Sequence, residues 1–327
     1  MNYKISVLLF TCFSLSFAAA QTDQGRKSNS KLVLVQDGIY MLQGKGGNIG
    51  LSIGNDGVLM IDDQFAEATE DILKDIGKIS KKPIQFLVNT HHHPDHTGGN
   101  VNIVKQGGLI VSHENVRDRL SKIVNASDDK SDTSDPRMLA TITFKEDLTF
   151  HYNNETIFVF HVHKAHTDGD AIVYFTESNV IHAGDVLFQG KYPFIDTDNG
   201  GTIQGYIEAL EKIAMVADND TKIIPGHGDI AKKTDLNFSA NMLTQLYKWV
   251  TFHYVNRKTE AEIINMRDFT KTYDDMGYGD GFISTEKILQ TIYNEVKKER
   301  GEIDERDMDE RLRDKARQQK EGVKKDG

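Results

Sequence analysis

The stretch Asn89–Asn100, "NTHHHPDHTGGN", contains four of the twelve histidines of this chain, together with a proline and an aspartate. It follows an apolar run and is expected to leave the end of a buried strand in an extended conformation. His91 and His93 are two residues apart, so their side chains leave the backbone on the same side and can bind one ion. Asp95 and His96 follow as adjacent ligands that can reach a second ion. The spacing predicts a metal site rather than a chance group of surface histidines.

The segments around this stretch alternate between strand and helix patterns. Short apolar runs rich in β-branched residues predict strands with Asp-Gly turns between Leu32 and Ile61, a buried strand in "PIQFLVNT", and two strands around the Ser178-Asn179 turn. Residues 65–80 and 203–216 have the apolar spacing of helices. The chain is therefore predicted to be an α/β protein with antiparallel meanders among its strands and helices.

The N-terminus has the pattern of a secretory signal. Lys4 precedes a short apolar run, and Ala18 and Ala20 supply a small-residue cleavage site. Residues 1–20 are predicted to be a signal peptide and residues 21–31 a flexible polar segment. The apolar run is shorter than the roughly 20 residues that span a bilayer. We expect a periplasmic or secreted protein with no stable membrane anchor after cleavage.

Cysteine usage and charge limit the chemistry and the partners. Cys12 is the only cysteine and lies in the predicted signal peptide, so the mature chain would have no thiol nucleophile or thiolate ligand. The formal net charge is 39 − 49 = −10, which argues against binding of nucleic acid or anionic membranes. A small-molecule substrate is the expected partner.

The opening stretch resembles a known family signature. Thr90–Gly99, "THHHPDHTGG", is similar to the T-H-x-H-x-D-H-x-G-G signature of the metallo-β-lactamase fold superfamily, which includes class B β-lactamase-like and glyoxalase II-like di-zinc hydrolases. Further segments of the pattern follow in the expected order over roughly residues 32–235: "GVLMIDD" with Asp62, "AHTDGD" with His166, "IHAGDVLF" with Asp185 and "IIPGHG" with His227. The resemblance implies a four-layer αββα sandwich.

The resemblance also implies a ligand for each position of a dinuclear site. One ion would be held by His91, His93 and His166, a second ion by Asp95, His96 and His227, and Asp185 would bridge the two. Imidazole and carboxylate ligands suit two Zn²⁺ ions, although iron or manganese also accepts them. Asp95 and Asp185 are the predicted catalytic carboxylates of this site.

Other side chains are assigned supporting or structural roles. Asp62 ends a strand and is expected to orient a ligand histidine from outside the ligand set. His92 points away from its neighbours and is predicted to be a bystander. His161 and His163 imitate a His-x-His pair, but the positions above already supply a full ligand set.

The expected reaction is hydrolysis of a carbonyl substrate by a metal-bound hydroxide. A β-lactam, a lactone or another ester or amide is the first expectation, and a glyoxalase II-type thioester is the alternative. Asp185 stands where one large lactamase subclass has a zinc-binding cysteine, which puts β-lactam hydrolysis in doubt. A non-catalytic metal-binding or interaction protein is the alternative of another class.

The segment Phe188–Thr202 follows the predicted bridging aspartate and is polar and rich in glycine. It is predicted to form one wall of the substrate cleft, with Lys191, Tyr192 and Phe194 as contacts and Lys191 able to hold a substrate carboxylate. The alternative is a surface loop in which Phe194 packs for stability only.

Three regions follow the signal and the flexible segment. Residues 32–236 are predicted to be the metallo-β-lactamase-like catalytic domain, and residues 237–296 a helical extension with periodic apolar positions. Residues 297–327 are almost free of apolar residues and interleave both signs of charge, so we expect a solvent-facing charged tail.

Overall fold

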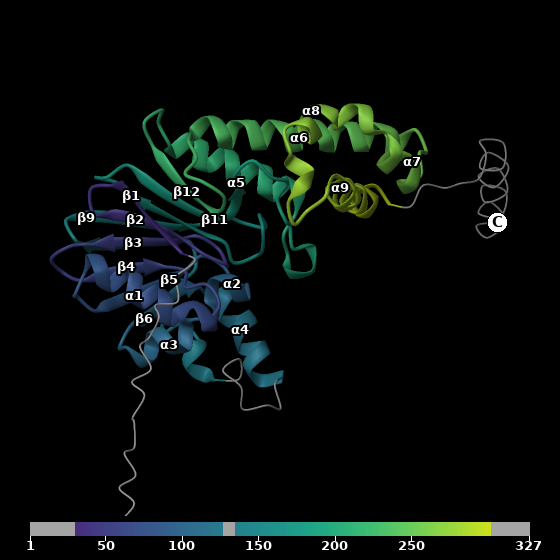
Figure 1. Cartoon of the computed structure of the whole chain (residues 1–327). Helices are drawn as coiled ribbons and strands as arrows, with labels where there is room; N and C mark the ends of the chain where they lie inside the picture. The colour runs from purple at the N-terminus through teal and green to yellow at the C-terminus, as the bar shows by residue number, and fades with distance from the viewer. Residues whose placement is uncertain (1–29, 127–134, 302–327) are drawn as a thin grey trace, which may run out of the picture.

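The computed structural model describes residues 30–126 and 135–301 (Figure 1). The predicted signal peptide, the flexible segment up to residue 29 and the charged tail from residue 302 lie outside the described residues. Within the described part of the chain, no helix is both long and apolar enough to cross a membrane.

Seven strands form the first sheet, in the order of the sequence. They are β1 (Lys31–Gln36), β2 (Ile39–Gln43), β3 (Ile49–Ile53), β4 (Val58–Ile61), β5 (Ile84–Asn89), β6 (Leu109–His113) and β7 (Ile142–Phe144). The first four strands pair antiparallel, as their short turns require, whereas β4 to β7 pair parallel through helical crossovers. The parallel pairing brings the ends of β4 and β5 to one edge of the sandwich.

Five strands form the second sheet, in the order β12-β11-β10-β9-β8. They are β8 (Asp147–Tyr152), β9 (Glu155–His161), β10 (Ala171–Phe175), β11 (Val180–Phe188) and β12 (Lys222–His227). All neighbours pair antiparallel except β11 and β12, which are parallel. The parallel pair delivers the ends of β11 and β12 to the same edge.

The two sheets pack face to face, and helices cover their outer faces (Figure 1). Between the sheets, Ile61 and Val88 of the first sheet share one buried cluster with Val173 and Ile224 of the second. The first sheet is covered by α1 (Thr69–Ile79), α3 (Asn100–Lys105) and α4 (Glu114–Ala126), and the second by α5 (Ile203–Val216) and α6 (Lys233–Val255). This order of layers confirms the predicted αββα sandwich.

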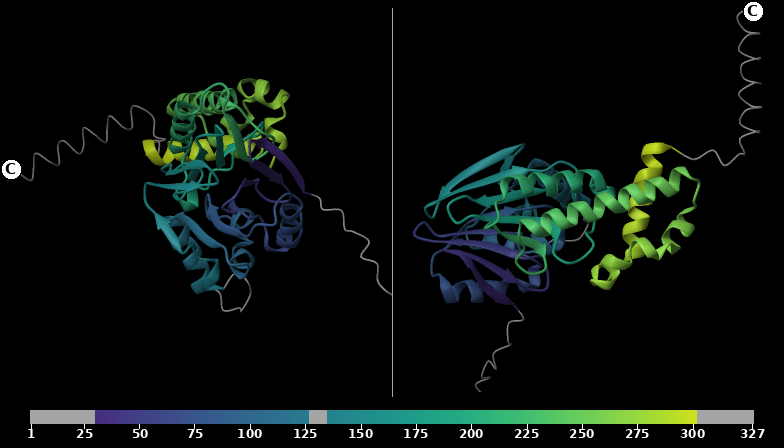
Figure 2. Two further views of the ribbon diagram at one scale, coloured as in Figure 1. Left: turned by 90° about the vertical axis from the view of Figure 1, so that its left-hand side faces the viewer. Right: turned by 90° about the horizontal axis from the view of Figure 1, so that it is seen from above.

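The C-terminal helices continue from the second sheet, as predicted, and Figure 2 shows α6 running from the sandwich into them. They are α7 (Glu260–Asn265), α8 (Lys271–Asp275) and α9 (Thr285–Arg300), with short 3-10 turns at Arg267–Phe269 and Tyr278–Asp280. One buried cluster runs from Val186 of β11 through Leu210 and Leu246 to Leu289 of α9. The helical extension therefore shares its hydrophobic core with the sandwich.

The remaining elements are short. They are η1 (Ala66–Ala68), α2 (Pro94–Thr97), η3 (Pro136–Met138) and η4 (Thr197–Asn199). The predicted helix over 65–80 begins as η1 and becomes α-helical at Thr69, with Ile72 and Ile76 buried against the first sheet.

The shared core predicts that the extension and the sandwich unfold together. Leu289→Ala should lower the free energy of unfolding by about 2–5 kcal/mol, because Leu289 is fully buried. The fluorescence of Trp249 in α6 and far-UV circular dichroism should report the same transition in denaturant. Met215→Ala, at a side chain on the surface of α5, should change stability by no more than about 0.5 kcal/mol. A separate, earlier transition of Trp249 would contradict this prediction.

Candidate metal centre

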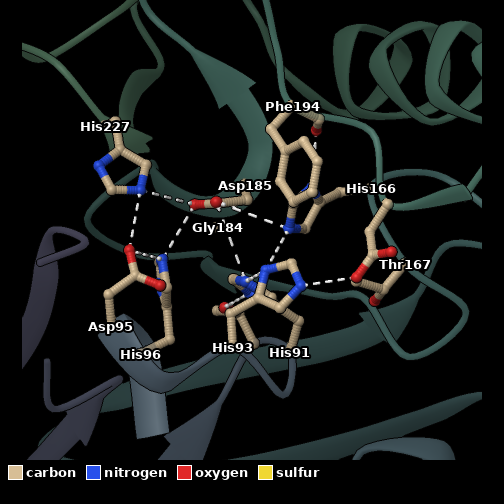
Figure 3. Close-up of polar contacts among 12 residues, drawn as sticks. His91, His93, Asp95, His96, His166, Thr167, Gly184, Asp185, Phe194 and His227 are labelled. Atoms are coloured by element: carbon tan, nitrogen blue, oxygen red, sulfur yellow. Dashed lines mark hydrogen bonds and ion pairs between the residues drawn. The ribbon is translucent and has the colours of Figure 1, made fainter. Parts of the chain in front are cut away.

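The ends of β4, β5, β11 and β12 and the loop after β9 bring the predicted ligands together at one edge of the sandwich (Figure 3). The residues after β5 turn into the one-turn helix α2, where Pro94 fixes the first helical position. This turn places the pair His91 and His93 on one side of the centre and the pair Asp95 and His96 on the other.

The first group consists of His91, His93, His166 and Asp185, whose ligand atoms all lie within 4.8 Å of one another. Nδ1 of His93 is 3.1 Å from Nε2 of His91 and 2.9 Å from Nε2 of His166. Oδ2 of Asp185 lies 3.6 Å from the same nitrogen of His166. Three imidazole nitrogens and a carboxylate oxygen thus point at one place, as the ligands of a divalent cation do.

The second group consists of Asp95, His96 and His227, again within 4.8 Å of one another. Oδ2 of Asp95 is 3.3 Å from Nε2 of His227, and Oδ1 of Asp185 is 3.1 Å from Nε2 of His96. Asp185 therefore turns one carboxylate oxygen to each group. The division of these ligands between two ions stays a prediction.

A test of fit comes from buried polar atoms. Nε2 of His96 and Oδ1 of Asp185 are buried and complete no hydrogen bond. Buried polar atoms without partners are uncommon in proteins because each loses its hydration without compensation. Two such atoms facing one place fit a bound cation, so we regard the residues present as suitable for a metal.

Asp62 orients this centre from the end of β4. Its carboxylate lies 2.7 Å from Nδ1 of His96 and accepts hydrogen bonds from the backbone N–H and hydroxyl of Thr90, each at 2.7 Å. The backbone of Asp62 is left-handed, with φ of 58°, a conformation that aspartate tolerates better than most residues. With Nδ1 of His96 bonded to Asp62, Nε2 is left to face the centre.

Two partners of the ligand histidines could not be predicted from the sequence. Oδ2 of Asp196 lies 2.8 Å from Nε2 of His93, and Nδ1 of His166 donates to the carbonyl oxygen of Phe194 at 2.7 Å. Each contact leaves the other ring nitrogen facing the centre. Asp196 is more than 100 residues from His93, and no local spacing connects the two. The one sequence signal for it is that Asp196 begins the polar, glycine-rich stretch "DTDNGG".

Two glycines that no sequence pattern singled out allow the backbone to approach the second group closely. A Cβ atom at Gly47 would lie 2.1 Å from the ring of His96, and one at Gly226 would lie 2.0 Å from Oδ1 of Asp185. The N–H of Gly47 also donates to the carbonyl oxygen of Asp95 at 3.0 Å. Any side chain at either glycine would displace a predicted ligand.

The remaining histidines lie beside the centre or apart from it. His92 is buried, and one of its ring nitrogens lies within 4.8 Å of ligand atoms of His93 and Asp196. Its Nδ1 has no hydrogen-bond partner. His161 stacks on His113 at 3.9 Å and binds the carbonyl oxygen of Asp170 through Nδ1. The His161 ring therefore belongs to a separate packed cluster.

Of the three predicted substrate contacts, only Phe194 lies beside the metal centre. The prediction for Tyr192 is wrong, because its ring is 1% exposed and packs 5.6 Å from the ring of Tyr278 in the core. Lys191 does not stand free in the cleft, because its ammonium group donates to the carbonyl oxygen of Gly277 at 2.8 Å. Residues between Phe194 and Thr202 line a cavity of about 360 Å³ opposite α9, but none of the seven predicted ligands is among its lining residues. The role of this segment as a wall of the substrate cleft stays a prediction.

The two groups differ in how they bind protons. Burial lowers the pKa of His166 to about 4 and the pKa of His91 well below its usual value, so both rings are neutral at pH 7. Burial also lowers the pKa of His227, but the carboxylates of Asp185 and Asp95 outweigh that effect and raise it to about 9. Without a metal, His227 therefore carries a proton that a cation must displace.

Comparisons with known proteins agree with this geometry. The sequence model of the metallo-beta-lactamase superfamily matches residues 43–227, more than half of the chain, and this range includes all seven predicted ligands. The chain belongs to the metallo-beta-lactamase superfamily. This membership agrees with the sandwich fold and with the order of the predicted ligands.

The chain is also similar in sequence to two hydrolases of other organisms. It is 27% identical over 146 residues to a hydroxyacylglutathione hydrolase of Pelagibacter ubique. The aligned residues cover 44% of this chain and 52% of the relative. It is also 27% identical over 177 residues to a probable hydroxyacylglutathione hydrolase of Schistosoma mansoni. That alignment covers 50% of this chain and 64% of the relative. The matches thus span about half to two thirds of these relatives.

The fold is similar to solved metallo-beta-lactamases. A metallo-beta-lactamase from Pontibacter korlensis matches with a TM-score of 0.56 and 17% identity over 66% of this chain and 99% of that chain. The DIM-1 metallo-beta-lactamase matches with a TM-score of 0.55 and 17% identity over 66% and 97%. At this identity the likeness concerns the fold alone.

The proton affinities predict different pH dependences for the two groups. Because the pKa of His227 is raised to about 9, zinc must displace a proton there at any lower pH. Affinity for the more weakly bound zinc should fall at least about tenfold per pH unit between pH 8 and pH 6. The tighter equivalent, held where burial keeps His91 and His166 neutral, should change less.

Calorimetric zinc titration of metal-free protein at pH 6, 7 and 8 measures both equivalents, so the tighter one serves as an internal control. Equal pH dependence of the two equivalents would contradict the prediction.

Proposed function

We propose that this chain is an exported hydrolase that uses two metal ions to cleave a carbonyl substrate. The observation that carries the proposal is the position of Asp185, whose two oxygens face two separate sets of ligand atoms at 3.1–3.9 Å. A carboxylate in this position could bind two ions at once. Without the ions it would destabilise the fold, because it is a buried charge.

Zinc is the ion we propose for both groups, since imidazole and carboxylate ligands without thiolates suit it. His91, His93 and His166 would hold one ion, Asp95, His96 and His227 the other, and Asp185 both. Two such ions, when bound, lower the pKa of a water between them and polarise a carbonyl oxygen. Asp62 and Asp196 would fix the rings of His96 and His93 through their outward nitrogens.

The open side of the site lies at Asp95 and His227, whose side chains are 25% and 35% exposed. Burial raises the pKa of Asp95, but His227 and His96 outweigh this and lower it, so Asp95 is an anion at neutral pH. We assign the carboxylate of Asp95 to accept a proton from the attacking water, through the oxygen that does not face His227, and to return that proton to the leaving group.

A thioester is the substrate class that we favour within this reaction. The two relatives named above are hydroxyacylglutathione hydrolases, and their sequence similarity carries more weight on substrate than a likeness in fold. An oxygen ester or lactone would undergo the same carbonyl chemistry. The β-lactam expectation has the fold in its favour but no sequence relative of that kind among those reported above.

The reaction is tested by a panel of substrates on the purified mature protein. An acyl-glutathione thioester should be hydrolysed faster than a lactone or a chromogenic cephalosporin, and a chelator should abolish the rate until zinc is restored. His166→Ala should lower kcat/KM by more than about 100-fold and remove about one equivalent of metal. Mutation of a residue that only hydrogen-bonds to a metal ligand already lowers metal affinity or activity by about 10–100-fold. His92→Ala, the matched control, should keep both equivalents.

Two results would contradict the proposal in different ways. Protein that binds two equivalents of zinc but hydrolyses nothing in the panel would support the alternative of a non-catalytic metal-binding protein. Loss of a full equivalent from His92→Ala would show that the ligands are divided wrongly.

Export is proposed on the N-terminal pattern, a charged residue, an apolar run and the Ala18-x-Ala20 site. We expect the chain recovered from the periplasm or medium of a bacterial host to begin at Gln21. N-terminal sequencing and the intact mass measure this directly. A chain that retains Met1 and stays in the cytoplasm would contradict the proposal.

A further inference from the structure

Two phenylalanine rings adjoin the histidines of the metal centre, and a third ring, from the helical extension, adjoins one of these two. Phe194 lies against the ring of His93 at 5.8 Å between centroids and 27° between planes (Figure 3). Phe188 stacks on His227 at 5.1 Å and 16°. We call Phe188, Phe194 and Phe282 the aromatic rim of the site.

Phe282 is the most exposed large apolar side chain of the described residues, at 85%. Its ring meets that of Phe194 edge to face at 5.7 Å. A single exposed apolar residue needs no explanation, but one that continues an aromatic surface beside a catalytic centre is typical of a binding site. Phe282 therefore extends the surface of Phe194 into solvent.

The segment that carries Phe282 is held against the loop that carries Phe194. The ammonium group of Lys191 donates to the carbonyl oxygen of Gly277, and the N–H of Tyr192 donates to the carbonyl oxygen of Tyr278 at 3.2 Å. The aliphatic stem of Lys191 also packs close to Gly281, because a Cβ atom at that glycine would lie only 3.1–3.4 Å from it. These contacts hold Phe282 in place beside Phe194 although its ring is exposed.

Two cations near the aromatic rim already have partners. Lys191, expected to hold a substrate carboxylate, instead binds the extension. The guanidinium group of Arg119 donates two hydrogen bonds to the carboxylate of Asp168, at 2.6 and 2.7 Å. Apolar contact with the rim is thus better supported than pairing of a substrate anion with either cation.

We propose that the aromatic rim binds an apolar, preferably aromatic, acyl group beside the scissile carbonyl of the substrate. This inference rests on the proposed hydrolase function and names the substrate group that the site selects. Phe282 would meet a ring of the acyl group in the offset or edge-to-face arrangement that aromatic pairs favour. A short acyl group such as acetyl would not reach it.

The test compares two thioesters of the same thiol, one phenylacetyl and one acetyl, on the zinc-loaded full chain. Phe282→Ala should lower kcat/KM for the phenylacetyl thioester by about 5–20-fold, the loss expected for one ring contact, and leave the acetyl thioester within about twofold. Phe282→Tyr should keep the preference. Phe252→Ala, at an exposed ring of α6 that contacts His253, is the matched control and should leave both rates unchanged.

A binding measurement separates this inference from the reaction. Calorimetry should show that phenylacetohydroxamate binds the zinc-loaded protein more tightly than acetohydroxamate, and that Phe282→Ala removes the difference. If neither thioester is hydrolysed but this difference is seen, the proposed reaction fails and the aromatic rim stands. If Phe282→Ala leaves both the kinetic and the binding preference unchanged, the aromatic rim is overturned even though the hydrolase proposal holds.

Discussion

The buried carboxylate of Asp185 is the constraint on which the rest of the site depends. Its oxygens lie 3.1–3.9 Å from ring nitrogens of four histidines, and a buried anion is costly unless cations or donors compensate it. The strands that carry these groups come from both sheets, so the sandwich must hold the edges of the two sheets in register. Close packing between the sheets, through residues such as Ile61 and Ile224, supplies that rigidity.

The parts of the site that could be predicted are those with a local pattern. His91, His93, Asp95 and His96 lie within six residues, where strand geometry and a single turn decide which way each side chain points. The more distant predicted ligands came from a family resemblance and not from spacing. The sandwich itself followed from strand patterns and the same resemblance.

What the sequence could not indicate depends on tertiary contacts between distant segments. Asp196 meets His93, Gly47 packs on His96, and Phe282 meets Phe194, each across a large separation in sequence. The sequence position of Lys191 suits a role in binding a substrate anion, but in the fold its ammonium group donates to the carbonyl oxygen of Gly277. A long, flexible cation finds its partner only when the packing is known, so its role cannot be taken from its position in a loop.

In the segment Gly277–Phe282, the backbone is held by hydrogen bonds while the side chain of Phe282 is exposed. The backbone of the turn is fixed by Lys191 and Tyr192, whereas the ring of Phe282 itself is almost fully in solvent. Exchange of an exposed side chain on a fixed backbone changes stability little. Evolution could therefore vary residue 282, and with it the preferred substrate, while every ligand of the metal centre stays constant.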